Sequence, residues 1–411
     1  MLDILRVNKL YKKENIKRGI IILLYFFFMS DNTVLFATNA NPLFPRIAQF
    51  FVYILGIWFL LSFINGKKIN SLELIFMGVV LCNIILTCLI RSDFSTGSYI
   101  YLIFLFLAAY IFTEIIKFDE FVYLYDNLIY FFSLISLIGV ILYSISPVII
   151  THFPKLSSQS YDYYNIGIWI TPTDFDYEFR NYGIFREPGV FQAYLIIGLL
   201  FQLFVLKTNL NRFFLYTIVL LTTKSTTGYI LYGLLIITYV LSSKTRVIYK
   251  ILLIIVCTVV VTIICLYEFS RVENSYSVFG KFNLENMSFL TRLITVIADF
   301  EIFKNNIAFG AGITQQYNQM PIITKKLFDI ESKIDTNTIV QQFASFGIFY
   351  GIVWNYSIVK FSMCISKKII EIFLIYFIFL LLLLNENFEY SILIYIFFFY
   401  GIKNRYLKIH N

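Results

Sequence analysis

The sequence has few charged residues and almost no histidine. Only 14% of its 411 residues are charged and 2 are histidines, whereas 59% are hydrophobic. Soluble domains carry about 25% charged residues, and a chain of this size could not bury so much apolar surface away from water. The composition therefore excludes a soluble enzyme, a disordered chain and a fibrous protein, and it predicts an all-α polytopic membrane protein. Long apolar runs without alternation argue against a transmembrane barrel.

The scarcity of metal-binding residue types excludes several kinds of site. The 5 cysteines lie in or beside apolar runs, which is typical of small buried hydrophobic residues and not of disulfides or metal ligands. With so few histidines, and with acids in D-x-D spacing only at Asp174-Phe-Asp176 in the outer loops, neither a metal nor a cofactor is expected. The net charge of +8 comes from basic residues spread through short connections, so nucleic acid is not an expected partner.

The apolar runs predict about twelve membrane-spanning helices, because one span needs about 20 apolar residues. They cover residues 19–37, 47–64, 72–90, 98–116, 121–145, 188–206, 209–223, 227–242, 247–267, 338–361, 369–384 and 388–402. The first run is interpreted as an uncleaved helix, since no clear A-x-A site follows a basic start. Residues 1–411 then form a single integral membrane domain.

Lysine and arginine gather in alternate short connections, which by the positive-inside rule predicts that both termini are cytoplasmic. Two long loops, residues 146–187 and 268–337, are then non-cytoplasmic, and amphipathic helices are expected in these loops. Among the acids within predicted spans, Glu73, Glu114 and Asp126 lie near cytoplasmic ends and are expected to snorkel or pair. Asp31 lies toward the outer half and has no such simple explanation.

The first candidate motif is Arg180-Asn-Tyr-Gly-Ile-Phe-Arg186-Glu187-Pro188-Gly189, which runs directly into a predicted span. Proline suits the first turn of a helix, and the helix dipole favours an anion such as Glu187 at that end. Arg180 and Arg186 could bind phosphate oxygens through their forked guanidinium groups. Alternatively, the acid caps the helix and the arginines touch lipid headgroups. The same loop is rich in aromatic residues, including Tyr182, which suit sugar rings or an interfacial aromatic belt.

The second candidate motif is Thr222-Thr-Lys224-Ser-Thr-Thr-Gly228, which divides one apolar stretch into two short arms. Each arm has about 15 residues and reaches about 23 Å, less than the roughly 30 Å hydrocarbon core. The polar apex is therefore expected within membrane depth, where irregular backbone must line protein or water. A lysine at this depth is costly and indicates function unless Lys224 snorkels to the outer surface.

Two further motifs lie in and after the second long loop. Residues 288–305 have apolar residues at helical spacing, with Arg292, Thr295 and Asp299 on the opposite face, which predicts an interfacial amphipathic helix. Alternatively, Arg292 and Asp299 form an ordinary surface pair. Gly310-Ala-Gly312 follows and predicts a turn or a close backbone approach. Asp335-Thr-Asn337 could cap the next span or orient a substrate hydroxyl.

In this order the motifs resemble Wzy-type polysaccharide repeat-unit polymerases, which belong to the O-antigen polymerase and ligase superfamily. The matching pieces are Arg180–Gly189, Leu221–Ser225, the Arg292 helix with Phe309–Gly312, and Asp335–Asn337 with Phe346–Ile348. The resemblance covers roughly residues 175–355. Ligase-like members tend to carry Ser-Arg at the short-helix apex and His-Asn before the tenth span. This chain has Ser225-Thr226 and Thr336-Asn337 instead, which weighs against a histidine-based mechanism.

The resemblance implies a GT-C-like glycosyltransferase in the bacterial cytoplasmic (inner) membrane that works without a metal or cofactor. Its substrate would be an undecaprenyl-pyrophosphate-linked oligosaccharide, joined into O-antigen or capsular polysaccharide at the outer leaflet. Membrane lipids, a chain-length regulator and a flippase are the implied partners. The chain could alternatively be an O-antigen ligase of the same superfamily. A polysaccharide transporter or flippase is the other alternative, although no internal repeat is visible.

Negative charge grows on the departing pyrophosphate, so preorganised cations should meet it. The candidate residues then have three expected roles: pyrophosphate binding, catalysis and contact with the acceptor sugar. Arg180, Arg186, Lys224 and Arg292 are expected to bind the pyrophosphate. Glu187 is the first choice for the general base and Asp335 the second, with Arg292 as a further catalytic residue. Tyr182 and Asn337 are expected to contact the acceptor sugar.

Overall fold

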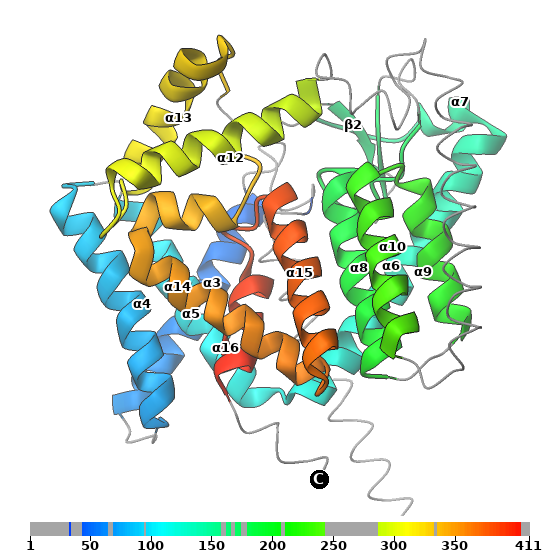
Figure 1. Cartoon of the computed structure of the whole chain (residues 1–411). Helices are drawn as coiled ribbons and strands as arrows, with labels where there is room; N and C mark the ends of the chain where they lie inside the picture. The colour runs from blue at the N-terminus through cyan, green and yellow to red at the C-terminus, as the bar shows by residue number, and fades with distance from the viewer. Residues whose placement is uncertain are drawn as a thin grey trace, which may run out of the picture.

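A computed structural model describes residue 33 and residues 43–64, 69–93, 96–157, 162–165, 169–173, 179–206, 210–242, 287–332 and 335–403. The described chain is mostly helical (Figure 1). The helices are α3 (Leu43–Ile64), α4 (Ser71–Ile90), α5 (Thr96–Ile115), α6 (Phe118–Ile145), α7 (Pro147–Ile150), α8 (Pro188–Phe204), α9 (Leu210–Thr222), α10 (Thr226–Ser242), α12 (Met287–Asn305), α13 (Ile313–Phe328), α14 (Ile339–Ile365), α15 (Ile369–Asn385) and α16 (Ile392–Ile402).

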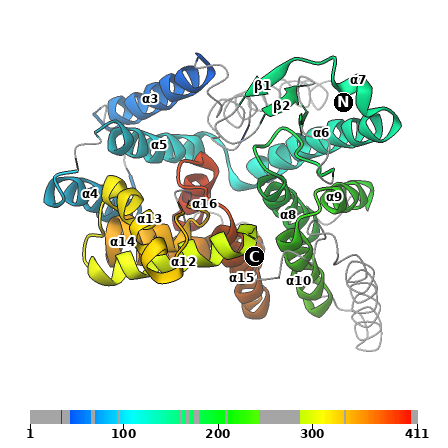
Figure 2. The ribbon, with the colours of Figure 1, turned by 90° about the horizontal axis from the view of Figure 1, so that it is seen from above.

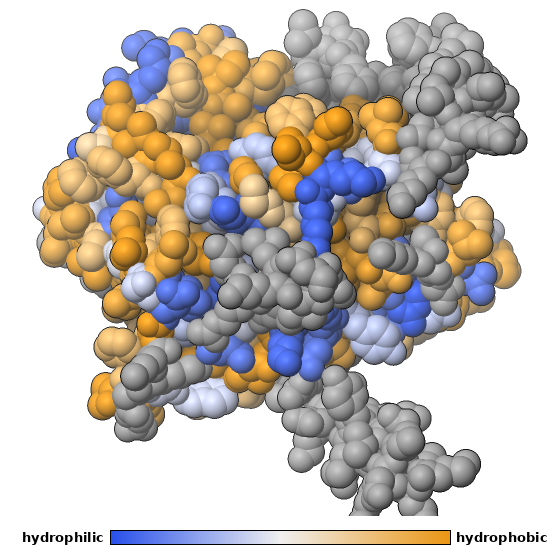
Figure 3. Space-filling view, turned by 60° about the horizontal axis from the view of Figure 1, so that its bottom comes forward, coloured by the Kyte–Doolittle hydropathy of each residue, from blue (hydrophilic) through white to orange (hydrophobic). Residues whose placement is uncertain are grey.

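Each predicted span within the described residues coincides with a helix to within a few residues. The predicted spans 19–37 and 247–267, like Asp31, lie outside the described residues. Among the described helices, 4 are long and apolar enough to cross a membrane, and further apolar helices are shorter. Large apolar side chains are exposed on the flanks, including Ile75 (64%) and Leu89 (65%), and apolar residues cover much of the surface in Figure 3. These features indicate a membrane-embedded, mostly α-helical protein.

Helices α8 and α16 form the centre of the fold. Both are apolar on all sides, which is typical of helices surrounded by protein, and every residue of α16 is buried. Helix α8 packs against α6, α9 and α10, whereas α16 packs against α5 and α14. Figure 2 shows these two groups side by side, with α12 crossing above α14 and α15.

Helix α14 is interrupted at Gly347, where φ is 82°. The turn Phe309–Gly312 fills the break, because its N–H groups donate to the carbonyls of Ala344 (2.7 Å) and Ser345 (3.0 Å). Backbone groups exposed by a helix break at membrane depth need such partners. The close backbone approach predicted for Gly310-Ala-Gly312 is thereby confirmed, and the second long loop is anchored in the helical bundle.

The first long loop differs from the expectation. We expected an amphipathic helix in residues 146–187, but the described part holds a three-stranded antiparallel sheet of β1 (Lys155–Ser157), β2 (Asp162–Asn165) and β3 (Ile170–Pro172). Aromatic and β-branched residues favour strands, and they dominate β2 and β3. A tryptophan beside β3, Trp169, packs over Gly139 of α6, where a Cβ would collide with the ring. Figure 1 shows this sheet, α12 and α13 at one end of the bundle.

Two of the three acids near the predicted cytoplasmic ends, Glu114 and Asp126, form ion pairs as expected, whereas Glu73 is buried and accepts a hydrogen bond from the Tyr110 hydroxyl (3.2 Å). Glu114 forms an ion pair of 2.7 Å with the buried Lys403. The carboxylate of Asp126 on α6, 2% exposed, forms an ion pair with Arg212 of α9. It also accepts hydrogen bonds from Gln202 (2.6 Å) and the Tyr216 hydroxyl (2.8 Å). This network joins α6, α8 and α9.

Removing the guanidinium at Arg212 should destabilise the protein strongly. Arg212→Ala leaves the buried Asp126 charge without its cation, which we expect to lower the free energy of unfolding by about 3–5 kcal/mol. Thermal unfolding of the purified protein in detergent is the measurement. The matched control is Lys304→Ala, because Lys304 pairs with Glu301 at 2.9 Å while 53% exposed, and such surface pairs contribute about 0–1 kcal/mol. Equal melting temperatures for the two variants would contradict this account.

Candidate functional site

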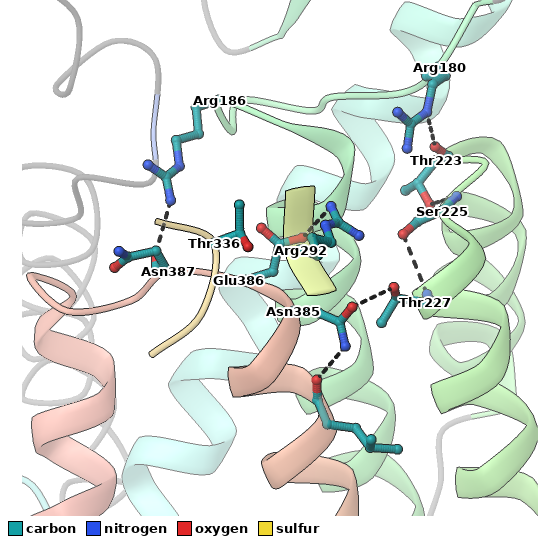
Figure 4. A network of polar contacts seen from close by, with 12 residues as sticks. Arg180, Arg186, Thr223, Ser225, Thr227, Arg292, Thr336, Asn385, Glu386 and Asn387 are labelled. Atoms are coloured by element: carbon teal, nitrogen blue, oxygen red, sulfur yellow. Dashed lines mark hydrogen bonds and ion pairs between the residues drawn. The ribbon is translucent and has the colours of Figure 1, made fainter. Parts of the chain in front are cut away.

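A cluster of arginines and carboxylates lies where the first turn of α8, helix α12 and the α15–α16 connection meet (Figure 4). The guanidinium of Arg292 on α12 lies 3.4 Å from the carboxylate of Glu386, which directly follows α15. Arg292 is 26% exposed at its side chain and Glu386 is 4% exposed. A Cβ at Gly189 would collide with the Glu386 carboxyl and lie 3.5 Å from the Arg292 Nη2 atom. The ion pair therefore lies directly against the first turn of α8.

The two arginines of the first motif hold neighbouring parts of this cluster in place. Arg186 donates from Nη2 to the carbonyl of Asn387 (2.9 Å), in the same connection as Glu386. Arg180 donates from Nε to the carbonyl of Thr223 (3.2 Å), at the α9–α10 apex. Burial lowers the pKa of Arg180, and the nearby positive charge of Arg292 acts in the same direction. Arg292 thus contacts the buried Glu386 carboxyl group, and Arg186 and Arg180 lie within electrostatic range of it.

The two carboxylates of the cluster have different surroundings. Glu187 is exposed at the N-cap position of α8, but its side chain makes no capping hydrogen bond. The interpretation of Glu187 as a simple capping acid is therefore wrong. The pKa of Glu386 is raised to about 7, mainly by burial. The positive charges of Arg292, Arg186 and Arg180 oppose this rise, and the charge of Glu187 adds to it. A carboxyl group with such a pKa can exchange a proton near neutral pH.

The α9–α10 apex lies beside the first motif. Asn181 donates from its backbone N–H to the Thr222 carbonyl (3.0 Å) and from its side chain to the Thr222 hydroxyl (2.9 Å). Lys224 adopts φ of 48° at the apex, next in the chain to the residue that Arg180 contacts. Thr227 bonds Asn385 of α15 across the cluster (3.2 Å). The polar apex is therefore built into the protein, as its short arms predicted.

Asp335 and Asn337 belong to a neighbouring cluster beneath α12 and α13. Asp335 accepts from Gln316 (2.9 Å), and Asn337 donates to both Asp299 (3.0 Å) and Asp335 (3.1 Å). Burial raises the pKa of Asp299 well above its usual range, and Asp335 adds to this effect. The side-chain oxygen Oδ1 of Asn337 also caps α14, accepting from the N–H of Val340 (3.0 Å). The capping interpretation of Asn337 is confirmed.

Helix α12 is present as predicted, but Arg292 and Asp299 do not pair with each other, as one of the two sequence interpretations supposed. Asp299 accepts from Gln316 at 2.7 Å, whereas Arg292 contacts Glu386, so an Arg292–Asp299 surface pair is wrong. The polar side of α12 faces the protein, since Thr295 and Asp299 are buried. Its apolar Phe300 is 52% exposed, as an interfacial helix requires.

Tyr182 lies at the edge of the cluster and packs against the first-loop sheet. Its ring contacts that of Tyr163 edge-to-face at 5.9 Å, and its proximity to Arg180 raises the pKa of that arginine. This position fits either of the two sequence interpretations, a sugar contact or an aromatic belt.

The sequence reasoning missed Glu386. Its local signal is Asn385-Glu-Asn-Phe-Glu389 between two predicted spans. This connection lies on the predicted non-cytoplasmic side and holds two acids without a basic residue. Among the described residues, no group of three or more His, Cys, Asp or Glu side chains could hold a metal ion.

No protein-family model matches the chain, and comparisons with curated proteins and with solved structures find no match. The arrangement of the cluster itself is therefore the basis for a functional assignment.

Proposed function

We propose that this protein polymerises undecaprenyl-pyrophosphate-linked oligosaccharide repeat units, as the Wzy-type polymerases that it resembles do. In this proposal the chain is a GT-C-like glycosyltransferase of about twelve spans in the bacterial inner membrane, with both termini cytoplasmic. The site faces the outer leaflet, and the product is O-antigen or capsular polysaccharide. A chain-length regulator and a flippase are the proposed partners.

The observation that carries the proposal is that Arg180, Arg186 and Arg292 all lie within electrostatic range of the buried Glu386. A diphosphate leaving group needs several preorganised donors, and arginine provides them in forked geometry. The arginines come from segments more than a hundred residues apart, yet all act on one carboxyl group beside the N-terminus of α8, where anions are favoured. Lys224 completes the proposed diphosphate site from the apex side.

Glycosyl transfer also needs a group that accepts the proton of the acceptor hydroxyl. Glu187 is exposed, so an acceptor sugar can reach it from outside. It also lies within electrostatic range of the buried Glu386 and of Arg180. Tyr182 lies beside the same arginine and is the proposed sugar contact. Asp335 keeps its proposed role as the second choice for the base, although its hydrogen bonds are directed to the neighbouring cluster.

Deletion of the gene in its native bacterium tests the proposed reaction. The polymerase predicts that surface polysaccharide is limited to one repeat unit. The ligase alternative predicts instead that finished polymer accumulates on undecaprenyl pyrophosphate. A flippase would leave single repeat units on the cytoplasmic side. Normal polymer after deletion would contradict the proposal.

Two substitutions of Glu187 distinguish a role as the general base from a purely structural role. Glu187→Gln keeps the shape of the side chain but removes its basicity, so we expect it to lose polymerisation about as far as Glu187→Ala, by roughly 10²-fold or more. Polymer formation by the purified protein on lipid-linked repeat units is the measurement. A Gln variant close to wild type beside an inactive Ala variant would show that Glu187 only organises the arginines. The proposed base would then move to Asp335.

A further inference from the structure

The cluster holds two carboxyl groups in different surroundings. Glu187 is exposed, whereas Glu386 is 4% exposed at its side chain and its pKa is raised to about 7 by burial. The groups that face Glu386 are Arg292 from α12 and Arg180, Arg186 and Glu187 from the segment before α8. Paired carboxyl groups that differ in this way are a mark of separate acid and base roles.

The charges of the proposed reaction favour a proton at this place. A diphosphate linked to lipid at one end and sugar at the other carries two negative charges. Like the charge of Glu187, they disfavour ionisation of the buried Glu386 and raise its pKa further. The bound complex therefore favours a neutral Glu386. When the sugar departs, the diphosphate gains a third ionisable oxygen beside the same carboxyl group.

We propose that Glu386 is the general acid of the transfer, an inference that rests on the proposed function. The bond between sugar C1 and the phosphate oxygen breaks, and the acceptor oxygen bonds to C1. The acceptor hydroxyl proton passes to the Glu187 carboxylate. The carboxylic proton of Glu386 passes to the phosphate oxygen that is released. Exchange with water then returns both groups to their starting states.

Hydrogen bonds fix the backbone around Glu386 beside the first turn of α8. The Thr338 hydroxyl donates to the Glu386 carbonyl (2.7 Å) and accepts from the Phe388 N–H (2.8 Å). Arg186 holds the next carbonyl along the chain, that of Asn387 (2.9 Å). The absence of a side chain at Gly189 gives the carboxyl group its space against α8. Such support is what a proton donor needs, because proton transfer depends on position before pKa.

Binding of a diphosphate probe tests the protonation of Glu386 without the polymerisation reaction. The probe is P1,P2-dimethyl diphosphate, a diester that does not titrate near neutral pH, and calorimetry in two buffers of different ionisation enthalpy measures the protons exchanged. We expect the wild type to take up roughly half a proton per site at pH 7, since a group with a pKa near 7 is half protonated before binding. Glu386→Gln should bind with no uptake. Glu389→Gln is the matched control, because Glu389 lies in the same connection but bonds Gln341 (2.9 Å), and it should behave as wild type.

The pH dependence of polymerisation tests the catalytic role. The wild-type kcat/KM should fall above about pH 7, as Glu386 of the free enzyme loses its proton. Glu386→Gln should be slower by roughly 10²-fold and lack this alkaline fall, whereas Glu389→Gln keeps it. If Glu386→Gln kept the alkaline fall, or if the probe bound without proton uptake, Glu386 would not be the general acid. The proposed polymerase function would not be affected by either result. A wild type that neither binds the probe nor polymerises would instead remove the proposed function.

Discussion

Replacing Arg292 with alanine should abolish polymer formation. Its guanidinium is the part of α12 that reaches the cluster, and it contacts Glu386 at 3.4 Å. Loss of one preorganised donor to a developing anion typically lowers the rate by roughly 10²–10³-fold. Arg292→Lys should recover little, because lysine keeps the charge but not the planar fork. Polymer ladders on gels are the measurement, with membrane expression of each variant determined in parallel.

A second variant separates chemistry from folding in this experiment. Arg292→Ala also leaves the buried Glu386 without its partner, which could by itself destabilise the protein. The double substitution Arg292→Ala with Glu386→Gln removes the unpaired charge. We expect this double variant to be as well folded as wild type by size-exclusion chromatography and to make less polymer than Glu386→Gln alone. Near-normal ladders in either well-expressed variant would show that Arg292 is an ordinary interfacial residue.

Replacing Gly310 with alanine should prevent stable folding. Gly310 has φ of +67°, and a Cβ there would collide with the backbone of Ser345 and Phe346 in the interrupted helix α14. A residue with a side chain is strained at such φ, and neighbouring backbone cannot move aside as a flexible side chain can. We expect the free energy of unfolding to fall by on the order of 3 kcal/mol or more. Thermal unfolding of the purified protein in detergent is the measurement.

Gly233 provides the matched control for this substitution. It lies within α10, and nothing lies within 4 Å of a Cβ added there. Gly233→Ala should therefore be neutral or stabilising, because alanine favours the helix by about 1 kcal/mol. If Gly310→Ala were as stable as Gly233→Ala, the turn Phe309–Gly312 would not hold the break in α14.

The helices were predictable because hydropathy is encoded in local runs of sequence. The apolar runs located the spans, and helical spacing located α12, which begins at Met287. The pairing of Asp126 and Glu114 was also predictable, since a buried charge in a span needs a partner. The sheet in the first loop was missed because hydropathy does not distinguish short strands from interfacial helices in a loop rich in aromatic residues.

The candidate site was predictable only in part. The motifs predicted that Arg180, Arg186 and Arg292 act at one site, and in the structure all three lie within electrostatic range of Glu386. The pairing of Arg292 with Glu386 could not be predicted, because 94 residues separate them and the contact depends on how α12 crosses the bundle. Asp335 illustrates the same limit, since its partners Asp299 and Gln316 come from two other helices.

Polymerisation by the purified protein is the most direct measurement of the central claim, that this arginine and carboxylate cluster transfers sugar from a lipid diphosphate. The protein is reconstituted with undecaprenyl-pyrophosphate-linked repeat units of its own bacterium and no other enzyme. We expect products of two or more repeat units on one lipid, with release of free undecaprenyl pyrophosphate, and neither product with Arg292→Ala. Repeat units that remain single in the presence of well-folded wild-type protein would contradict the account.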